Sequence, residues 1–159
     1  MSRNISKTNA CRILDARNTA YDIIDYESND EELDAVSVAR KIGLPPEEVF
    51  KTLILCGDVL RYFVIVVPGN CEVSLKKVAT STGNKSCNLL PLKELEPLTG
   101  YIRGGCSPIG MKKQFPTFIE ETALLFERIS VSAGRRGQQI LIAPNDLAEA
   151  VTASFADLL

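Results

Sequence analysis

A glycine-rich loop is the first segment whose residues can do chemistry. Three glycines and a proline fall within Gly104-Gly105-Cys106-Ser107-Pro108-Ile109-Gly110. Backbone N–H groups in such a loop are not covered by side chains, so they can converge on a carbonyl or carboxylate oxygen and stabilise negative charge during acyl transfer. The alternative is a tight turn that only joins two elements, and composition alone favours it. The spacing fits neither the GxGxxG fingerprint nor the P-loop.

Two other segments carry groups that can bind phosphate. Lys51 begins an otherwise apolar strand and Thr52 follows it. An ammonium there can hold a phosphate as a point charge while Thr52 donates a second hydrogen bond, and the alternative is a strand-end lysine in solvent. Strand alternation places Ser130 and Ser132 on one face, and the turn Gly134-Arg135-Arg136-Gly137 presents two guanidinium groups. For this turn, a phosphate grip and a basic hairpin without a ligand fit equally well.

Histidine is absent from the chain, which excludes a Ser-His-Asp or Cys-His catalytic pair and any His-ligated metal within it. The five cysteines are odd in number and form no Cys-x-x-Cys pair, so neither a zinc site nor a disulfide framework is expected. Cys106 is expected to line a pocket rather than to attack a substrate, because no histidine can activate it. We therefore expect no metal and no cofactor.

The elements that must position these groups belong to one expected domain, residues 1–159. Apolar spacing predicts helices over residues 8–17, 34–42, 74–82 and 91–96, and a C-terminal helix capped by Asn145 or Asp146. Strands are predicted over residues 21–26, 51–56, 61–67, 116–120, 128–132 and 138–143. Helices and strands are mixed without strict alternation, which favours an α+β fold.

Charge and hydropathy indicate the cellular compartment in which the protein is expected to act. There are 18 Lys and Arg against 20 Asp and Glu, so the net charge is −2. An acidic stretch over residues 25–34 is interpreted as a solvated loop. The N-terminus lacks an apolar signal core and the apolar runs are too short to cross a membrane, so we expect a cytoplasmic protein without membrane contact.

In their order along the chain, these segments resemble the YbaK/EbsC family of freestanding aminoacyl-tRNA deacylases. The wider superfamily includes the editing insertion of bacterial prolyl-tRNA synthetase. The resemblance runs from about residue 13 to residue 155. Its matching stretches are Tyr26, Gly43-Leu44-Pro45, Val49-Phe50-Lys51-Thr52-Leu53, Ser74-Leu75-Lys76-Lys77-Val78-Ala79, Thr99-Gly100-Tyr101, the glycine-rich loop, Lys112-Lys113, Val131-Ser132-Ala133-Gly134-Arg135-Arg136-Gly137 and residues 143–147.

The resemblance implies a compact α+β domain with a mixed, barrel-like sheet flanked by helices. It also implies trans-editing hydrolysis of mischarged tRNA, chiefly Cys-tRNA(Pro). Lys51 would match the essential lysine near the terminal adenosine and its phosphate, and residues 104–108 the loop that cradles the aminoacyl group. Gln139 stands where some members have Asp. The residues expected in catalysis are Lys51, Gly104, Gly105 and Ser107, and those expected to bind substrate are Tyr26, Thr52, Cys106, Pro108, Gly110, Ser132, Gly134, Arg136 and Gln139.

A cysteinyl ester brings its own thiol, with a pKa of about 8.5, which can attack the ester carbonyl within the same molecule. Direct attack by a bound water is the competing route. The expected partner is the 3′ CCA end of tRNA(Pro), with prolyl-tRNA synthetase as a possible helper. Two alternatives stay open: a deacylase for another mischarged tRNA such as Ala-tRNA(Pro), or a non-catalytic module that binds aminoacyl-tRNA or a nucleotide.

Overall fold

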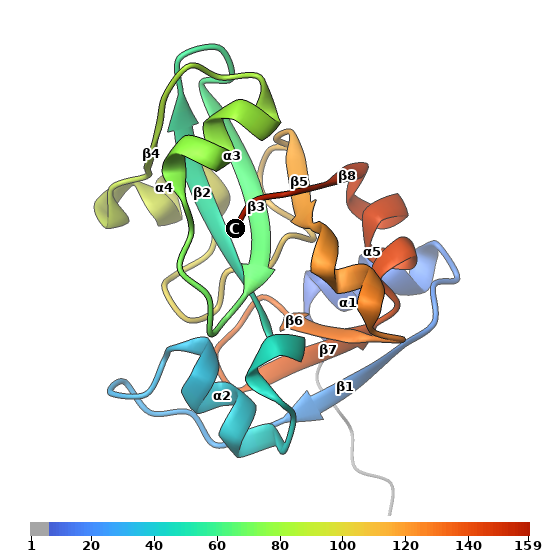
Figure 1. Cartoon of the computed structure of the whole chain (residues 1–159). Coiled ribbons are helices and arrows are strands. Elements are labelled where there is room, and N and C mark those ends of the chain that lie inside the picture. The colour runs from blue at the N-terminus through green and yellow to red at the C-terminus, as the bar shows by residue number, and fades with distance from the viewer. Residues whose placement is uncertain (1–6) are drawn as a thin grey trace, which may run out of the picture.

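The computed structural model describes residues 7–159, whose strands form two sheets flanked by helices (Figure 1). Its elements, in chain order, are α1 (Asn9–Ala16), β1 (Tyr21–Asp25), α2 (Ala35–Ile42), η1 (Pro46–Glu48), β2 (Phe50–Gly57), β3 (Tyr62–Pro68), α3 (Leu75–Thr82), β4 (Cys87–Leu89), η2 (Leu92–Glu94), α4 (Leu95–Thr99), β5 (Thr117–Glu120), η3 (Glu121–Leu125), β6 (Ile129–Ser132), β7 (Gln138–Ile142), α5 (Pro144–Val151) and β8 (Ala153–Ala156).

The larger sheet has the order β4-β2-β3-β5-β8 and carries the predicted lysine. Strands β2 and β3 form an antiparallel hairpin that sets Lys51 opposite Val67, while β5 and β8 add to it in parallel. The tip of the hairpin is fixed by Asn84, whose side-chain oxygen accepts from the amides of Val59 and Leu60 at 2.9 and 2.8 Å. A Cβ atom on Gly57 would lie 2.4 Å from that oxygen, so only glycine fits there.

The smaller sheet is antiparallel, with the order β1-β7-β6, and lies across the lower end of the β2–β3 hairpin in Figure 1. A bridge between Val49 and Ser130 joins the two sheets. The main core fills the space between them and includes fully buried Val66, Ile119 and Ile140. Because β2, β6 and β7 meet here, polar residues at their ends come together.

Three helices begin with a side chain that caps the first turn. Thr8, Asp34 and Ser74 cap α1, α2 and α3, and each side chain accepts from a backbone amide of the first turn. The predicted cap of α5 was wrong, because this helix begins at Pro144 with Ala143 as its N-cap. Proline suits the first helical position, since its φ is preset and that position needs no N–H donor.

The expected fold class is confirmed: an α+β structure with a mixed sheet flanked by helices. The resemblance implied a barrel-like sheet, but the two sheets do not close into a barrel. Strands β4 and β8 and helix η3 were not predicted. Both strands lie at sheet edges and are at most four residues long, so they show too little alternation to be recognised from sequence.

Candidate active site

A cavity of about 500 Å³ opens between β2, the start of α2, the β4–α4 segment and the glycine-rich loop. This volume is in the range of small-molecule sites, about 300–1,000 Å³. It brings together six of the predicted site residues: Lys51, Thr52, Gly104, Cys106, Ser132 and Gln139. These residues come from four separate segments, so the fold itself assembles the cavity.

Lys51 and Thr52 form the wall provided by β2. The Lys51 ammonium donates one hydrogen bond, to the carbonyl of Cys71 at 3.1 Å, and therefore keeps donors for a ligand. The Thr52 hydroxyl is buried and has no hydrogen-bond partner within residues 7–159. A buried polar group without a partner costs about 1–3 kcal/mol, which a bound ligand that pairs with it would recover.

Ser132 and Gln139 pair across β6 and β7 and provide the floor. The Gln139 oxygen accepts from the Ser130 hydroxyl at 2.7 Å, which leaves the amide nitrogen to donate into the cavity. The Ser132 oxygen accepts from the Gly134 amide at 3.1 Å, which leaves its hydroxyl hydrogen free to donate. The floor therefore offers neutral hydrogen bonds rather than a carboxylate.

The glycine-rich loop forms a further part of the cavity lining. Gly104 has φ +83°, and a Cβ atom there would lie 2.9 Å from a methyl carbon of Leu33. The Gly105 amide donates to the Ile102 carbonyl at 3.0 Å, so it supports the loop. The amides of Gly104 and Cys106 donate to no acceptor among the described residues. These two N–H groups therefore have no acceptor within the described part of the protein.

Internal contacts hold this loop in shape. The Tyr101 hydroxyl donates to the Ile109 carbonyl at 2.5 Å, across the base of the loop. On its other side, Gly105 packs against the backbone of Arg135, where an added Cβ would come within 3.1 Å. Gly134, in the same turn as Arg135, lies against the Tyr101 ring. The turn over residues 134–137 thus supports the glycine-rich loop.

Several predicted site residues lie outside the described cavity lining. Ser107 is fully buried and its hydroxyl accepts from the Ile109 amide at 3.2 Å. Pro108 is buried too, and Gly110 lies against the Tyr101 hydroxyl. Tyr26 lines a smaller pocket with Glu27, Asn29 and Lys41. Direct substrate contact by these residues, and by Gly105, Gly134 and Arg136, remains a prediction.

The guanidinium group of Arg136 is hydrogen-bonded to two other parts of the protein. Its Nε donates to the Arg103 carbonyl at 2.9 Å and its Nη1 to Asp30 at 3.0 Å. It therefore ties the acidic stretch, which was interpreted as a solvated loop, to the residue that precedes Gly104. This stretch leads to Leu33 and Asp34, which line the cavity.

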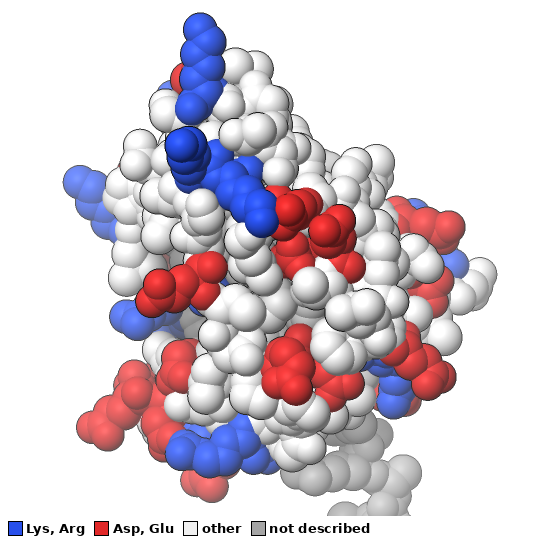
Figure 2. All heavy atoms as spheres, in the orientation of Figure 1, with Lys and Arg blue, Asp and Glu red and all other residues white. Residues whose placement is uncertain are grey.

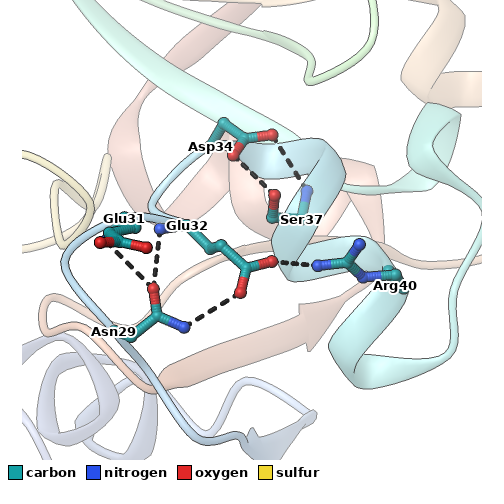
Figure 3. A network of polar contacts seen from close by, with 6 residues as sticks. All are labelled: Asn29, Glu31, Glu32, Asp34, Ser37 and Arg40. Carbon is teal, nitrogen blue, oxygen red and sulfur yellow. Dashed lines mark hydrogen bonds and ion pairs between the residues drawn. The ribbon is translucent and has the colours of Figure 1, made fainter.

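The acidic stretch has a defined structure of its own (Figure 3). The Asn29 oxygen accepts from the amides of Glu31 and Glu32 at 3.0 and 2.9 Å, and Glu32 pairs with Arg40 on α2. Asp34 then accepts from the Ser37 amide and hydroxyl at 3.1 and 2.7 Å. These contacts position Leu33 against Gly104.

Cys106 lines the cavity as a neutral thiol, because burial raises its pKa from 9.0 to about 12. This raised pKa opposes a nucleophilic role for Cys106, because the attacking form of cysteine is the thiolate.

A consequence for stability follows from this pKa. The folded state holds the Cys106 proton above pH 9.0, where the unfolded chain releases it, so this contribution to stability is complete below pH 9.0 and is lost as pH rises towards about 12. We expect the melting temperature of the wild type to fall more steeply than that of Cys106→Ala between about pH 9 and pH 11. Thermal unfolding followed by circular dichroism measures both, and parallel curves would contradict the assignment.

Sequence reasoning missed two groups of lining residues. The first is the start of α2, with Leu33, Asp34, Ala35 and Val38. The second is a leucine-rich segment around β4 and η2, together with Arg103. A signal was present in each case: Leu33 is a lone apolar residue in an acidic stretch, and four leucines fall between residues 89 and 95.

The surface charge is mixed. On the face drawn in Figure 2, basic side chains gather over α3 and the tip of the β2–β3 hairpin, and acidic side chains lie beside and below them. This face offers no continuous basic stripe of the kind that binds the backbone of long nucleic acids. None of the helices within residues 7–159 is long and apolar enough to cross a membrane.

A two-sheet α+β fold thus carries one cavity lined by polar side chains, by leucines and by the glycine-rich loop. Residues 30–150 match the family model of the aminoacyl-tRNA editing domain. The chain therefore belongs to the aminoacyl-tRNA editing family, as its resemblance implied, and is an enzyme that edits mischarged tRNA.

The chain is also similar to individual proteins of known sequence or structure. The chain is 45% identical over 152 residues to EbsC of Enterococcus faecalis, provisionally named a Cys-tRNA(Pro)/Cys-tRNA(Cys) deacylase. The alignment covers 96% of this chain and 93% of that protein. The chain is 25% identical over 132 residues to YwhH of Bacillus subtilis, covering 83% and 82% of the two chains. A crystal structure of a protein provisionally described as a trans-editing enzyme for prolyl-tRNA synthetase shares the fold, with a TM-score of 0.81 at 21% identity. The match covers 96% of this chain and 98% of that one.

Proposed function

We propose that this protein removes cysteine from Cys-tRNA(Pro) in the cytoplasm. The observation that carries the proposal is a pair of amides, at Gly104 and Cys106, that have no acceptor within residues 7–159 and belong to the lining of a cavity that Lys51 also lines. An aminoacyl ester has the matching parts: a carbonyl that becomes an oxyanion during reaction, and a nucleotide phosphate nearby. The 45% identity to EbsC supports cysteine as the amino acid.

In the proposed complex, the ester carbonyl accepts from the Gly104 and Cys106 amides. The Lys51 ammonium holds the phosphate of the terminal nucleotide, and the Thr52 hydroxyl gains the partner that it lacks in the free protein. Ser132 and Gln139 donate to the polar atoms of the aminoacyl group. Backbone amides act best here because they are already oriented before charge develops on the oxygen.

The substrate supplies the nucleophile. The cysteinyl sulfur attacks its own ester carbonyl, so an S–C bond forms and the C–O bond to the ribose breaks. The thiol gives up its proton to water before it attacks, and the departing ribose oxygen takes a proton from water. A further water then opens the cyclic thioester to release free cysteine. The protein needs no base of its own, which fits a chain without histidine and with a protonated Cys106.

We further propose that contact is confined to the 3′ CCA end. A net charge of −2, and the mixed charges on the face drawn in Figure 2, give little attraction for the tRNA body. Prolyl-tRNA synthetase would then hold the tRNA and raise its local concentration, since tethering makes the second binding event effectively intramolecular.

Lys51→Ala is the first test. We expect kcat/KM for Cys-tRNA(Pro) to fall about ten- to hundredfold, because hydrogen bonds to charged groups contribute about 1.5–3 kcal/mol. Release of labelled cysteine, with and without prolyl-tRNA synthetase, measures this loss.

The matched control is Lys85→Ala, which removes an exposed lysine beside the opposite end of β2. It should retain wild-type activity. Unchanged activity in Lys51→Ala would remove Lys51 from the mechanism, and saturable binding without any cysteine release by the wild type would overturn the proposed activity.

A further inference from the structure

Most of the polar side chains that line the cavity are cations or offer hydrogen-bond donors. Lys51 and Arg103 are cations. The Gln139 oxygen accepts from the Ser130 hydroxyl, so Gln139 offers its amide nitrogen instead. Asp34 is the one acidic residue among the described residues that line the cavity. A ligand group that can only donate, such as an ammonium, therefore has its anionic acceptor at Asp34.

Asp34 is held in place by its two neighbours in the chain. Leu33 packs against Gly104, where an added Cβ atom would lie 2.9 Å from a methyl carbon of the leucine. Ala35 packs against Gly69, where an added Cβ atom would lie 2.2 Å from the Cβ of the alanine. Gly104 and Gly69 both line the cavity, so the chain around Asp34 is in contact with two parts of that lining.

The protein uses only part of the hydrogen-bonding capacity of the Asp34 carboxylate (Figure 3). As the N-cap of α2, it accepts from the Ser37 amide at 3.1 Å and from the Ser37 hydroxyl at 2.7 Å. A carboxylate has about four lone-pair positions, so these two bonds leave room for further donors. The hydrogen bond from Ser37 also lowers the pKa of Asp34 below its usual value, which keeps the carboxylate charged at neutral pH. Asp34 is exposed, and a ligand can therefore reach it.

We infer that Asp34 binds the α-ammonium group of the aminoacyl ester. This inference rests on the proposed function, in which the ester carbonyl accepts from the Gly104 and Cys106 amides. One carbon atom joins the ammonium to that carbonyl, so the ammonium must lie close to Gly104, and Asp34 directly follows the residue that packs against Gly104. Lys51 and Arg103 repel an ammonium, which leaves Asp34 as the lining group of matching charge.

An ion pair at Asp34 gives the site a specificity that the substrate thiol does not supply. An ester whose α-amino group is acylated, as in peptidyl-tRNA, carries no ammonium and would leave the carboxylate without its partner. Such an ester would bind more weakly than an aminoacyl ester with a free amine, and the difference in affinity is the specificity. Hydrolysis would therefore be restricted to tRNA whose amino acid has not yet entered a peptide.

Binding is tested with two stable amides of 3′-amino-3′-deoxyadenosine. One carries cysteine, and the other carries 3-mercaptopropionate, which is cysteine without its amine. Isothermal titration calorimetry at about pH 6, where an α-amino group is protonated, measures Kd for both. For Asp34→Asn we expect Kd of the cysteinyl amide to rise about five- to tenfold, between the effects of an exposed ion pair and of a hydrogen bond to a charged group. Kd of the mercaptopropionyl amide should not change.

Two further variants separate the charge of Asp34 from its structural role. Asparagine and serine cap helices about as well as aspartate does, so both Asp34→Asn and Asp34→Ser keep the start of α2 and lose only the charge. Asp34→Ser should therefore show the same change in Kd. Glu31→Gln is the matched control, because it removes one charge from the same acidic stretch outside the cavity lining. It should match the wild type with both amides.

The outcomes separate this inference from the proposed activity, since release of cysteine from Cys-tRNA(Pro) is measured independently. An equal loss of affinity for both amides, or no loss for either, would overturn the role of Asp34 even in an active deacylase. Failure of the wild type to bind either amide would overturn it too. An Asp34-dependent preference for the cysteinyl amide, in a protein that releases no cysteine, would keep the ammonium site and reject deacylation.

Discussion

A tRNA(Pro) that carries serine is expected to lose its amino acid at least about a hundredfold more slowly than the same tRNA carrying cysteine. The two substrates differ by one atom, an oxygen in place of a sulfur. The serine hydroxyl is far less acidic than the thiol, whose pKa is about 8.5, so it supplies almost no anionic nucleophile near neutral pH. Alanine, which has neither group, should be as slow as serine.

The measurement is the first-order rate of deacylation for the three tRNAs, each divided by its uncatalysed rate. For the cysteinyl substrate the rate should rise with pH towards the thiol pKa of about 8.5, because the thiolate is the attacking form. The chain has no histidine to add a transition of its own in this range. Equal enhancement for all three amino acids would show that water attacks directly.

Gly104→Ala is expected to reduce kcat by about 10²- to 10³-fold, the usual cost of losing an oxyanion donor. Gly104 has φ +83°, and its Cβ would lie 2.9 Å from Leu33. The loop must therefore shift, and its amide would then leave the position proposed for the oxyanion donor. Single-turnover deacylation with enzyme in excess measures the chemical step alone.

Gly43→Ala is the matched control for this variant. Gly43 has φ +75° at the end of α2, but no atom lies within 4 Å of the position of an added Cβ. Both variants should lose about 1–2 kcal/mol of stability from left-handed strain. Only Gly104→Ala should lose activity, and equal activity of the two variants would contradict a role for the loop in catalysis.

Local sequence signals predicted most of the fold. The caps at Thr8, Asp34 and Ser74 lie beside apolar residues at helical spacing, and the strands on either side of Gly57-Asp58 are continuous apolar runs. Such signals involve neighbours in the chain, so one sequence suffices to read them. The end of α5 nearest β7 was misread because asparagine and aspartate were weighed above the proline that precedes them.

The candidate site was predicted only in part. Lys51, Thr52, Gly104, Cys106, Ser132 and Gln139 do meet in one cavity. What the sequence does not disclose is which donors are already used: the Gly105 amide is engaged by Ile102, and Arg136 by Asp30 and Arg103. These partners are set by tertiary packing, which local patterns do not encode.

The hydrogen bond between the Tyr101 hydroxyl and the Ile109 carbonyl bears on how quickly the proposed binding of a tRNA end could occur. Since the loop is closed on itself in the free protein, the entropy of ordering it is lost during folding and not at each encounter. In the proposed function, a correctly charged tRNA binds a loop that is already ordered, does not react, and dissociates without a conformational step to reverse. Editing by such a site would therefore delay correctly charged tRNA very little.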